Sequence, residues 1–304
     1  MKMSINAYLG IDVGSVTTKL ALVDEKGKYI DSYMLKTAGK PVEAVQNGLK
    51  QIVAQATQEY NIQGVGTTGS GRNLAGALVG ADVIKNEITA HAVAASTNVE
   101  GVQTILEIGG QDSKIIILRD GIVTDFAMNT VCAAGTGSFL DHQAQRLNVP
   151  IEKFGETALR STNPARIAGR CGVFAESDLI HKQQLGYPVE DLLYGLCQAL
   201  VRNYLSNLAL GKEILPTVTF QGGVATNSGM VKAFEEAVNA TKEQLTKLKE
   251  PTQPKRTDSM SDEYFETALR NYQSELKVYK TKKAESISTN KHYFLYLSQK
   301  RRAV

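Results

Sequence analysis

Long apolar runs, cysteine and net charge are all scarce in this sequence. No apolar run approaches the roughly 20 residues that span a bilayer, and the chain reaches Asp12 without the apolar core of a signal peptide. The formal charge of +3 is too small to indicate a nucleic-acid partner. With 3 cysteines in 304 residues, a disulfide framework is not expected. We therefore expect a cytoplasmic protein in which a functional cysteine is a metal ligand or redox group.

One pattern of short strands occurs twice. Apolar strands that begin at Tyr8 and Thr104 each end in a glycine turn, and two further strands follow each of them as a meander. A Rossmann unit would instead place a helix directly after its first turn. Helical spacing is predicted over 41–60, 87–96, 137–147, 192–210 and 228–238. The sequence therefore predicts an α/β protein with two similar lobes.

The composition changes near Ala240. No glycine follows Gly229, although the chain has 26, and the final segment is rich in lysine and arginine. Helical spacing returns over 262–280. We therefore divide the chain into a first lobe (1–100), a second lobe (101–239) and an atypical basic, helical tail (240–304).

The strongest local signal for a ligand is the octamer Asp12-Val-Gly-Ser-Val-Thr-Thr-Lys19. A hairpin of this kind directs backbone N–H groups and hydroxyls at phosphate oxygens, and a carboxylate at the strand end can hold Mg²⁺ through water. An ordinary Gly/Ser-rich hairpin has the same composition. We assign nucleotide contacts here to Gly14, Ser15, Val16, Thr17, Thr18 and Lys19.

Two further glycine turns support a nucleotide site. Gly109-Gly-Gln-Asp112 lies at the matching point of the second copy, so the two turns can face each other across a cleft. Gly222-Gly-Val-Ala225 suits a flat adenosine, although helix–strand packing explains it equally well. A P-loop is disfavoured because no Walker motif is present. Asp12 and Asp112 are assigned to Mg²⁺ and the attacking water, with Gln111 beside them. The remaining predicted nucleotide contacts are Gly109, Gly110, Gly135, Thr136, Gly137, Gly222, Gly223, Val224 and Ala225.

Two cysteines stand in settings that suit a metal. Cys132 lies just before Ala133-Ala-Gly-Thr-Gly and a helix start, where exposed N–H groups stabilise a thiolate. Cys171 lies beside Arg170 in a run of small residues. Two cysteines cannot complete the four-thiolate shell of a [4Fe–4S] cluster, whereas a symmetric dimer supplies four. The alternative is that both are buried small hydrophobes, which is the role expected of Cys197.

Together these segments resemble the ATP-dependent activators of 2-hydroxyacyl-CoA dehydratases and the related benzoyl-CoA reductase ATPase subunits, the BadF/BadG/BcrA/BcrD-type ATPases of the actin/hexokinase superfamily. The resemblance covers about 8–237. It rests on Leu9-Gly-Ile-Asp-Val-Gly-Ser-Val-Thr-Thr-Lys, Ile108-Gly-Gly-Gln-Asp, Asn129-Thr-Val-Cys-Ala-Ala-Gly-Thr-Gly, Cys171-Gly-Val-Phe-Ala-Glu-Ser and Gly222-Gly-Val-Ala. Sugar and acetate kinases share the nucleotide turns but lack the two cysteine motifs.

The resemblance implies duplicated actin-like (ribonuclease-H-like) lobes with ATP or ADP and Mg²⁺ in the cleft between them. It also implies a homodimer in which Cys132 and Cys171 of both copies hold one [4Fe–4S] cluster. ATP hydrolysis would drive one electron from this cluster to a partner dehydratase or acyl-CoA reductase, with reduced ferredoxin or flavodoxin as the donor. The alternatives are a small-molecule kinase of the same fold, or a nucleotide sensor that has lost turnover.

Two departures from the family pattern stand out. Glu107 replaces the aspartate that usually precedes Ile-Gly-Gly-Gln-Asp. The chain also lacks the C-terminal Gly-Ala-x-Gly-Ala-Ala motif that closes the second lobe. Either the nucleotide cleft is incomplete or another element fills the gap.

Overall fold

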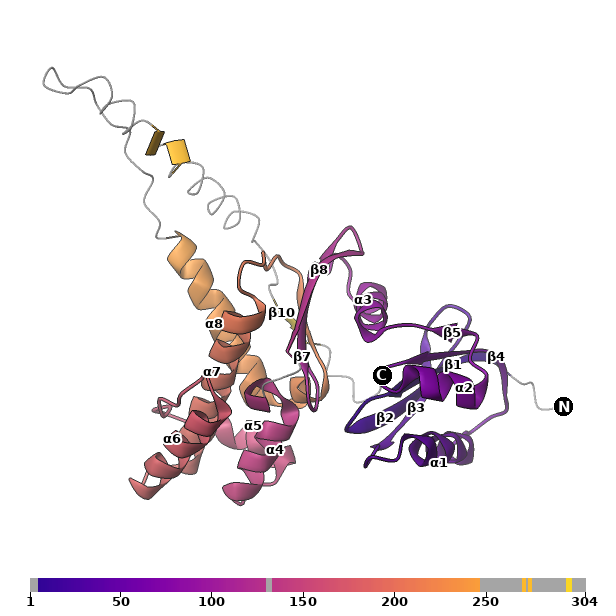
Figure 1. Cartoon of the computed structure of the whole chain (residues 1–304), viewed down its shortest axis with the longest axis horizontal. Coiled ribbons are helices and arrows are strands. Elements are labelled where there is room, and N and C mark those ends of the chain that lie inside the picture. The colour runs from indigo at the N-terminus through magenta and orange to yellow at the C-terminus, as the bar shows by residue number, and fades with distance from the viewer. Residues whose placement is uncertain (1–4, 130–132, 247–269, 272, 275–293, 297–304) are drawn as a thin grey trace, which may run out of the picture.

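A computed structural model describes the chain over residues 5–129, 133–246, 270–271, 273–274 and 294–296. Two α/β lobes lie side by side, each built on a five-stranded sheet (Figure 1). Among the described residues, no helix has both the length and the apolar character needed to cross a membrane. The predicted fold class of duplicated α/β lobes is confirmed by the two sheets.

The first lobe is a meander followed by two parallel strands. Its elements are β1 (Ile5–Val13), β2 (Thr17–Val23), β3 (Tyr29–Lys36), α1 (Pro41–Ala54), β4 (Tyr60–Thr68), α2 (Arg72–Val79) and β5 (Val83–Ile84), in the sheet order β3-β2-β1-β4-β5. Pro41 begins α1, where a missing N–H costs nothing. Gly80 ends α2 in the left-handed region. The core lies between the sheet and these helices and includes Ile11 and Leu20.

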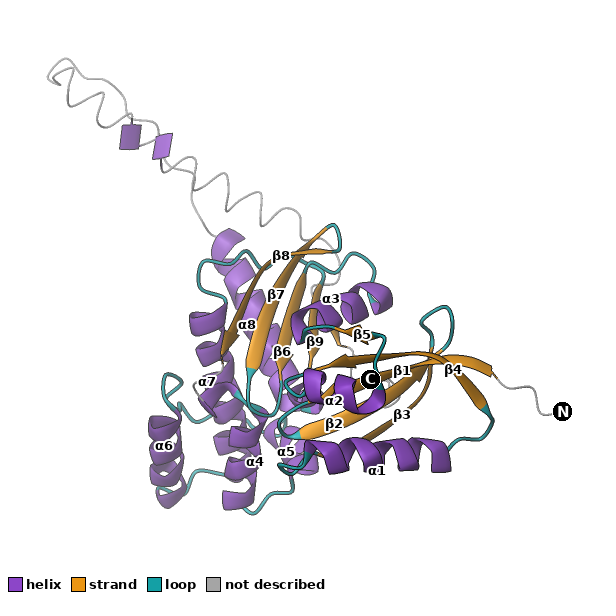
Figure 2. Cartoon of the chain, turned by 45° about the vertical axis from the view of Figure 1, so that its right-hand side comes forward, coloured by secondary structure: helices purple, strands orange, loops and turns teal. Residues whose placement is uncertain are grey.

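The second lobe repeats this topology and adds a helical layer. Its elements are β6 (Thr104–Ile108), β7 (Ser113–Arg119), β8 (Ile122–Asn129), η1 (Ala133–Gly135), α4 (Gly137–Arg146), α5 (Ile151–Ala158), α6 (Gly172–Gln184), α7 (Val189–Leu208), β9 (Val218–Gln221), η2 (Gly223–Thr226), α8 (Ser228–Thr246) and β10 (Phe294–Tyr296). The sheet order β10-β9-β6-β7-β8 matches the first sheet strand for strand, with β10 in the place of β5. Figure 2 shows α4 to α8 gathered on one side of this sheet.

Helix α7 organises the core of the second lobe. Its side chains Leu193, Leu196 and Leu200 are almost completely buried. Tyr204 of α7 packs edge-on against Phe234 of α8, with ring centroids 5.3 Å apart. Removing a buried ring of this kind costs about 3–5 kcal/mol. Helices α7 and α8 therefore pack closely together in the core of the second lobe.

Helix α3 (Glu87–Asn98) connects the lobes and packs on the second sheet (Figure 2). Ala92 and Ala95 lie in one buried cluster with Ile116 and Leu118 of β7. The side chain of Asn86 caps the helix by accepting the N–H of Thr89. In the described residues, the chain thus leaves the first sheet at the end of β5, Ile84, and joins the second lobe three residues later, at Glu87.

Two predicted helical segments need correction. The helix predicted over 41–60 ends at Ala54, and Tyr60 begins β4, because this segment pairs in parallel with β1. The predicted helical tail contains a strand, since Phe294–Tyr296 pairs in parallel with Val218–Phe220. This strand completes the sheet without the expected glycine-rich motif. Most of 247–304, including most of the helix predicted over 262–280, lies outside the described residues.

Candidate functional site

The turn between β1 and β2 closes the first candidate phosphate site. Gly14 N–H donates to Thr17 O (2.9 Å), which leaves Ser15 and Val16 at the tip. Neither tip N–H has a hydrogen-bond acceptor among the described residues, so both are available to an anion. Thr18 is instead buried and bonds Thr37. Thr18, one of the predicted nucleotide contacts in this turn, is therefore a buried residue of the first lobe.

Asp12 faces Lys19 beside this turn. The two residues are cross-strand partners, and Lys19 Nζ lies 3.2 Å from Asp12 Oδ2. Each side chain keeps about a third of its surface exposed (34% for Asp12, 35% for Lys19). Both charges therefore remain accessible, the carboxylate to a hydrated metal ion and the ammonium to phosphate.

The turn between β6 and β7 has the same hydrogen bond. Gly109 N–H donates to Asp112 O (2.9 Å), so Gly109 corresponds to Gly14 and Asp112 to Thr17. Gln111 is exposed at the tip. A Cβ at Gly110 would lie 2.6 Å from Val16 Cγ2 of the first turn. The two glycine turns therefore lie against each other at the junction of the lobes.

The third turn, after β9, covers the end of β6. Gly222 has φ of 88°, and a Cβ there would lie 2.2 Å from Ile108 O and 2.7 Å from Glu107 Oε1. Only glycine fits this approach. Gly223 is open, with nothing within 4 Å of a Cβ. Val224 and Ala225 are buried, so the backbone is the part of these two residues that a nucleotide could contact.

The start of α4 is bonded to the second turn. Gly137 N–H donates to Gly109 O and Ser138 N–H donates to Gly110 O, both at 2.8 Å. These N–H groups are therefore engaged, and Gly137 supports the turn. Gly135 and Thr136, which are also predicted contacts, lie in the buried approach to the helix.

Lys114 is a buried cation beneath the second turn. Only 2% of its side chain is exposed, and its Nζ lies 2.9 Å from Asp112 Oδ1, 3.1 Å from Glu107 Oε2 and 3.5 Å from Glu87 Oε2. Burial alone would lower the pKa of Lys114, but these three carboxylates outweigh it and raise the pKa. Tyr204 of α7 also donates to the backbone carbonyl of Lys114. Lys114 thus holds three carboxylates from three parts of the chain.

Glu107 is the carboxylate that is buried together with Lys114. Burial raises the pKa of this carboxyl, and His91 and Lys114 partly offset the rise. His91 Nδ1 lies 2.9 Å from Gln221 Oε1, so it donates to that amide oxygen. Sequence reasoning missed Glu87, His91 and Lys114. One signal was present, because Asp12 to Lys19 and Glu107 to Lys114 share a spacing of seven residues.

Cys171 is a free, partly exposed thiol at the N-cap of α6. A Cβ at the next residue, Gly172, would lie 3.3 Å from Ala134 Cβ, so the starts of α6 and η1 are in contact. Cys132 lies outside the described residues, two positions before Ala134. Cys197 is fully buried in the core, and burial raises the pKa of its thiol.

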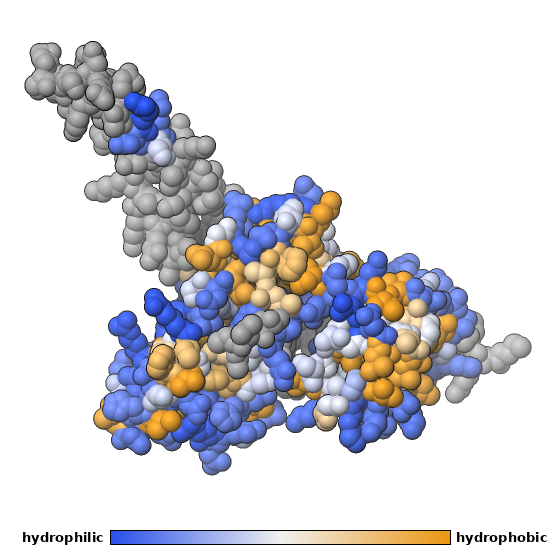
Figure 3. Space-filling view, viewed as in Figure 1, coloured by the Kyte–Doolittle hydropathy of each residue, from blue (hydrophilic) through white to orange (hydrophobic). Residues whose placement is uncertain are grey.

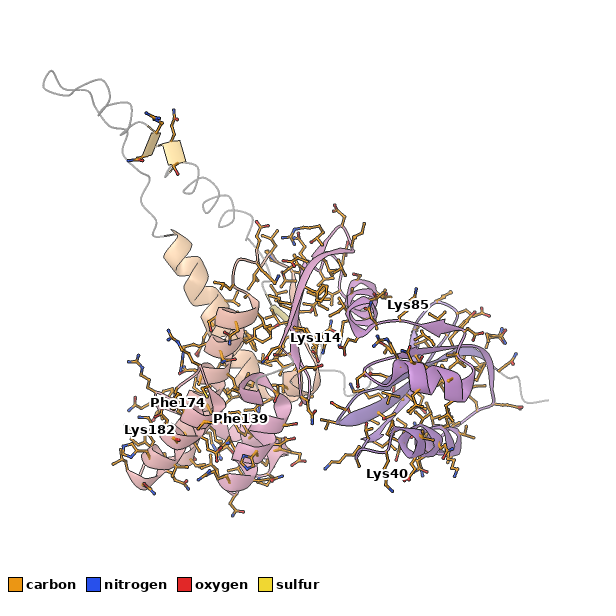
Figure 4. The ribbon with its side chains drawn as sticks, viewed as in Figure 1. Lys40, Lys85, Lys114, Phe139, Phe174 and Lys182 are labelled. Atoms are coloured by element: carbon orange, nitrogen blue, oxygen red, sulfur yellow. The ribbon has the colours of Figure 1, made fainter. Side chains whose placement is uncertain are left out.

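Two apolar side chains are exposed beside Cys171. Val173 and Phe174 keep 69% and 65% of their surface exposed, and Figure 4 shows Phe174 on α6. Apolar surface is also visible over the first lobe in Figure 3. The exposed apolar side chains of that lobe include Leu74, Leu78 and Val83. In the described residues, no group of three or more His, Cys, Asp or Glu side chains is arranged to hold a metal ion.

Comparison with known families decides the relationship. The BadF/BadG/BcrA/BcrD ATPase family matches residues 9–257. The chain belongs to this ATPase family. The (R)-2-hydroxyglutaryl-CoA dehydratase activating ATPase of Acidaminococcus fermentans is 34% identical over 231 residues, which are 76% of this chain and 87% of that protein. The activator of lactoyl-CoA dehydratase from Anaerotignum propionicum is 35% identical over 228 residues, covering 74% and 86%.

A solved family structure shares the fold. The activator of the 2-hydroxyisocaproyl-CoA dehydratase from Clostridium difficile, with bound ADPNP, superposes with a TM-score of 0.68 at 26% identity. The alignment covers 94% of this chain and 98% of that one. Glu107, the departure from the usual family aspartate, points to Lys114 rather than to open solvent. Its extra methylene is thus accommodated within the buried charge cluster.

Proposed function

We propose that this ATPase uses ATP hydrolysis to drive one-electron transfer from a [4Fe–4S] cluster to a partner 2-hydroxyacyl-CoA dehydratase or related acyl-CoA reductase. One observation carries the proposal: the N–H groups of Gly137 and Ser138 bond the carbonyls of Gly109 and Gly110. The helix that follows the Cys132 segment is thereby attached to the candidate nucleotide turn. The names of the relatives, which are activators of such dehydratases, agree with this role.

The first lobe supplies the accessible charges for the nucleotide. Asp12 would hold Mg²⁺ through water, and Lys19 with the tip amides of Ser15 and Val16 would bind phosphate oxygens. From the second lobe, Asp112 keeps 32% of its side chain exposed and Gln111 is exposed beside it. We assign these two side chains to the metal and the attacking water. Positioning and charge neutralisation are what phosphoryl transfer requires of a protein.

The cysteine side of the proposal rests on the α6 N-terminus. Cys171 is partly exposed where the helix dipole favours a thiolate, which fits an iron ligand. The contact between Gly172 and Ala134 joins the start of α6 to η1, and Ala134 follows Cys132 by two positions in the sequence. Cys132 and Cys171 from two copies would complete a four-thiolate shell. When bound, the cluster would supply one electron to the partner. Reduced ferredoxin or flavodoxin would then reduce the cluster again.

The nucleotide and cysteine regions can communicate through a short path. Any shift of the Gly109–Gly110 carbonyls displaces the first turn of α4, because the two hydrogen bonds are direct. A two-state change of this kind is biased by whichever nucleotide is bound. The exposed apolar pair Val173 and Phe174 offers contact area for a second copy beside Cys171.

Anaerobic purification tests the proposal. We expect a brown, oxygen-labile protein that contains about four irons per dimer and hydrolyses ATP. Iron content, the ultraviolet–visible spectrum and the mass in solution are measured on the same sample. An anaerobically reconstituted protein that is colourless and iron-free would refute the cluster. A monomer that retains four irons would refute the shared site.

A further inference from the structure

The segment from Lys85 to Glu87 is the covalent junction of the lobes. Lys85 N–H donates to Thr67 O of the first sheet (3.0 Å). Two residues later, Glu87 Oε2 lies 3.5 Å from Lys114 Nζ of the second. Figure 4 shows Lys85 in this junction next to α3, and Lys114 on the second lobe. In the part of the chain that the structure describes, the lobes are joined covalently here alone, so relative motion of the lobes must be absorbed in this segment.

Lys114 connects this junction to the second glycine turn. The same ammonium contacts Glu87 at the junction and Asp112 in the turn, while Glu107 lies directly opposite it on β6. The contacts differ in strength. Asp112 and Glu107 are 2.9 and 3.1 Å away, whereas Glu87 is 3.5 Å away and 28% exposed. The bond to Glu87 is therefore the one with room to shorten.

The balance of charge gives the direction of a change. One ammonium faces three carboxylates, so Asp112 and Glu107 repel Glu87 while Lys114 attracts it. A Mg²⁺–nucleotide bound at Asp112 would neutralise that carboxylate and remove its repulsion of Glu87. The net attraction of Glu87 towards Lys114 would then increase, and it is strong because Lys114 is removed from water.

We propose that Lys114 is a positioning residue that links Asp112 to the junction at 85–87, so that nucleotide bound at Asp112 tightens the Glu87–Lys114 contact and closes the lobes. This proposal rests on the proposed function for the role of Asp112. His91, one turn of α3 after Glu87, bonds Gln221 and keeps this end of the helix on the second lobe. A shift of Glu87 is therefore transmitted to Lys85 and the first sheet rather than lost within α3.

Glu87→Gln tests the link, because it removes the charge and keeps the size of a side chain that lies outside the nucleotide turns. Wild-type protein with Mg²⁺ and ADPNP should become more compact in small-angle scattering and should protect the amides of 85–89 from hydrogen exchange. In Glu87→Gln this protection should fall about three- to fivefold, the factor that loss of a partly exposed charge pair gives. Glu87→Gln should change the affinity for Mg²⁺–ADPNP less than it changes the closure. Glu87→Asp, which keeps the charge, should restore part of the closure.

The matched control is Glu43→Gln, which removes an exposed carboxylate that pairs with Lys40 on α1. It should leave both readouts unchanged. Closure and protection in Glu87→Gln equal to wild type would overturn the inference, as would a variant that is only less stable to heat. Wild-type protein that binds the nucleotide without closing would overturn it too. If wild-type protein binds no nucleotide, the proposed function fails first and this inference fails with it.

Discussion

Glu107 occupies in the second sheet the position that Asp12 occupies in the first. Each lies two residues before a turn glycine, and each is the cross-strand partner of a lysine, Lys114 or Lys19. The pairs differ in burial: the Asp12 pair is about one-third exposed, whereas Glu107 and Lys114 are 5% and 2% exposed. The duplicated sites have therefore diverged. One pair is accessible to solvent, and the other is buried beside Gly222 and α3.

Asp12→Asn should abolish most ATP turnover. The amide keeps the size of the side chain but loses the charge that would hold the hydrated metal, and losing one such group typically costs about 10²–10³ in rate. Steady-state ATP hydrolysis at saturating Mg²⁺ measures the effect. Asp31→Asn is the matched control, because Asp31 Oδ1 accepts the N–H of Ser32 and an amide oxygen preserves that bond. Turnover in Asp12→Asn equal to wild type would contradict the metal assignment.

Glu107→Gln should change how stability depends on pH. Burial raises the pKa of Glu107 above its usual value of 4.5. The contribution of the protonated Glu107 carboxyl to the free energy of unfolding is thus fully present below pH 4.5. It is lost as the pH rises through the pKa of Glu107 in the folded protein. The Glu107→Gln variant has no carboxyl to ionise at this position and does not lose stability in this way. Its free energy of unfolding relative to wild type should therefore increase between about pH 5 and pH 8. Urea denaturation at both pH values measures the difference.

Lys114 does not obscure that comparison. Its pKa is raised above 10.5, so it stays charged throughout the window. It also keeps Asp112 and Glu87 as partners when Glu107 is replaced. Glu43→Gln, on the surface of α1, should show a constant difference from wild type over the same range. A Glu107→Gln protein whose relative stability falls as the pH rises would show that the Lys114 pair outweighs burial.

The sequence predicts the local parts of this site better than their pairing. The strand–glycine–strand patterns at Asp12 and Gly109 predict both turns, because a turn depends on residues close in the chain. The Lys114 cluster depends on the register of β6 with β7 and on where α3 packs. The local sequence pattern determines neither of these. Likewise Tyr60 continues an apolar helical pattern, yet pairing with β1 makes it the start of β4. Tertiary contacts override propensity in such segments.

Gly110→Ala should separate the two phosphate turns. The added methyl would lie 2.6 Å from Val16 Cγ2, a distance that forces the turns apart. We expect nucleotide affinity to fall about tenfold or more, since a small misplacement at such a site has large effects. Gly66→Ala in β4 is the matched control, because a Cβ there would lie 3.8 Å from Val83 O, an ordinary contact distance, and Gly66 is not one of the predicted nucleotide contacts. Calorimetric titration with Mg²⁺–ADP compares them, and equal affinities would contradict the close approach of the turns.

Cysteine variants separate metal binding from packing. Cys171→Ala should lose the iron and keep the fold, because the Cys171 side chain makes no capping hydrogen bond and is partly exposed. Cys132→Ala should lose the iron equally, since each copy would supply two of four ligands. Cys197→Ala is the internal control: it should keep the iron but unfold at a lower temperature, because a fully buried group is truncated. Iron assays and thermal unfolding under nitrogen give both readouts. If Cys197→Ala loses iron while Cys171→Ala retains it, the ligand assignment is wrong, because the thiol that α6 presents to solvent would then be the one not used.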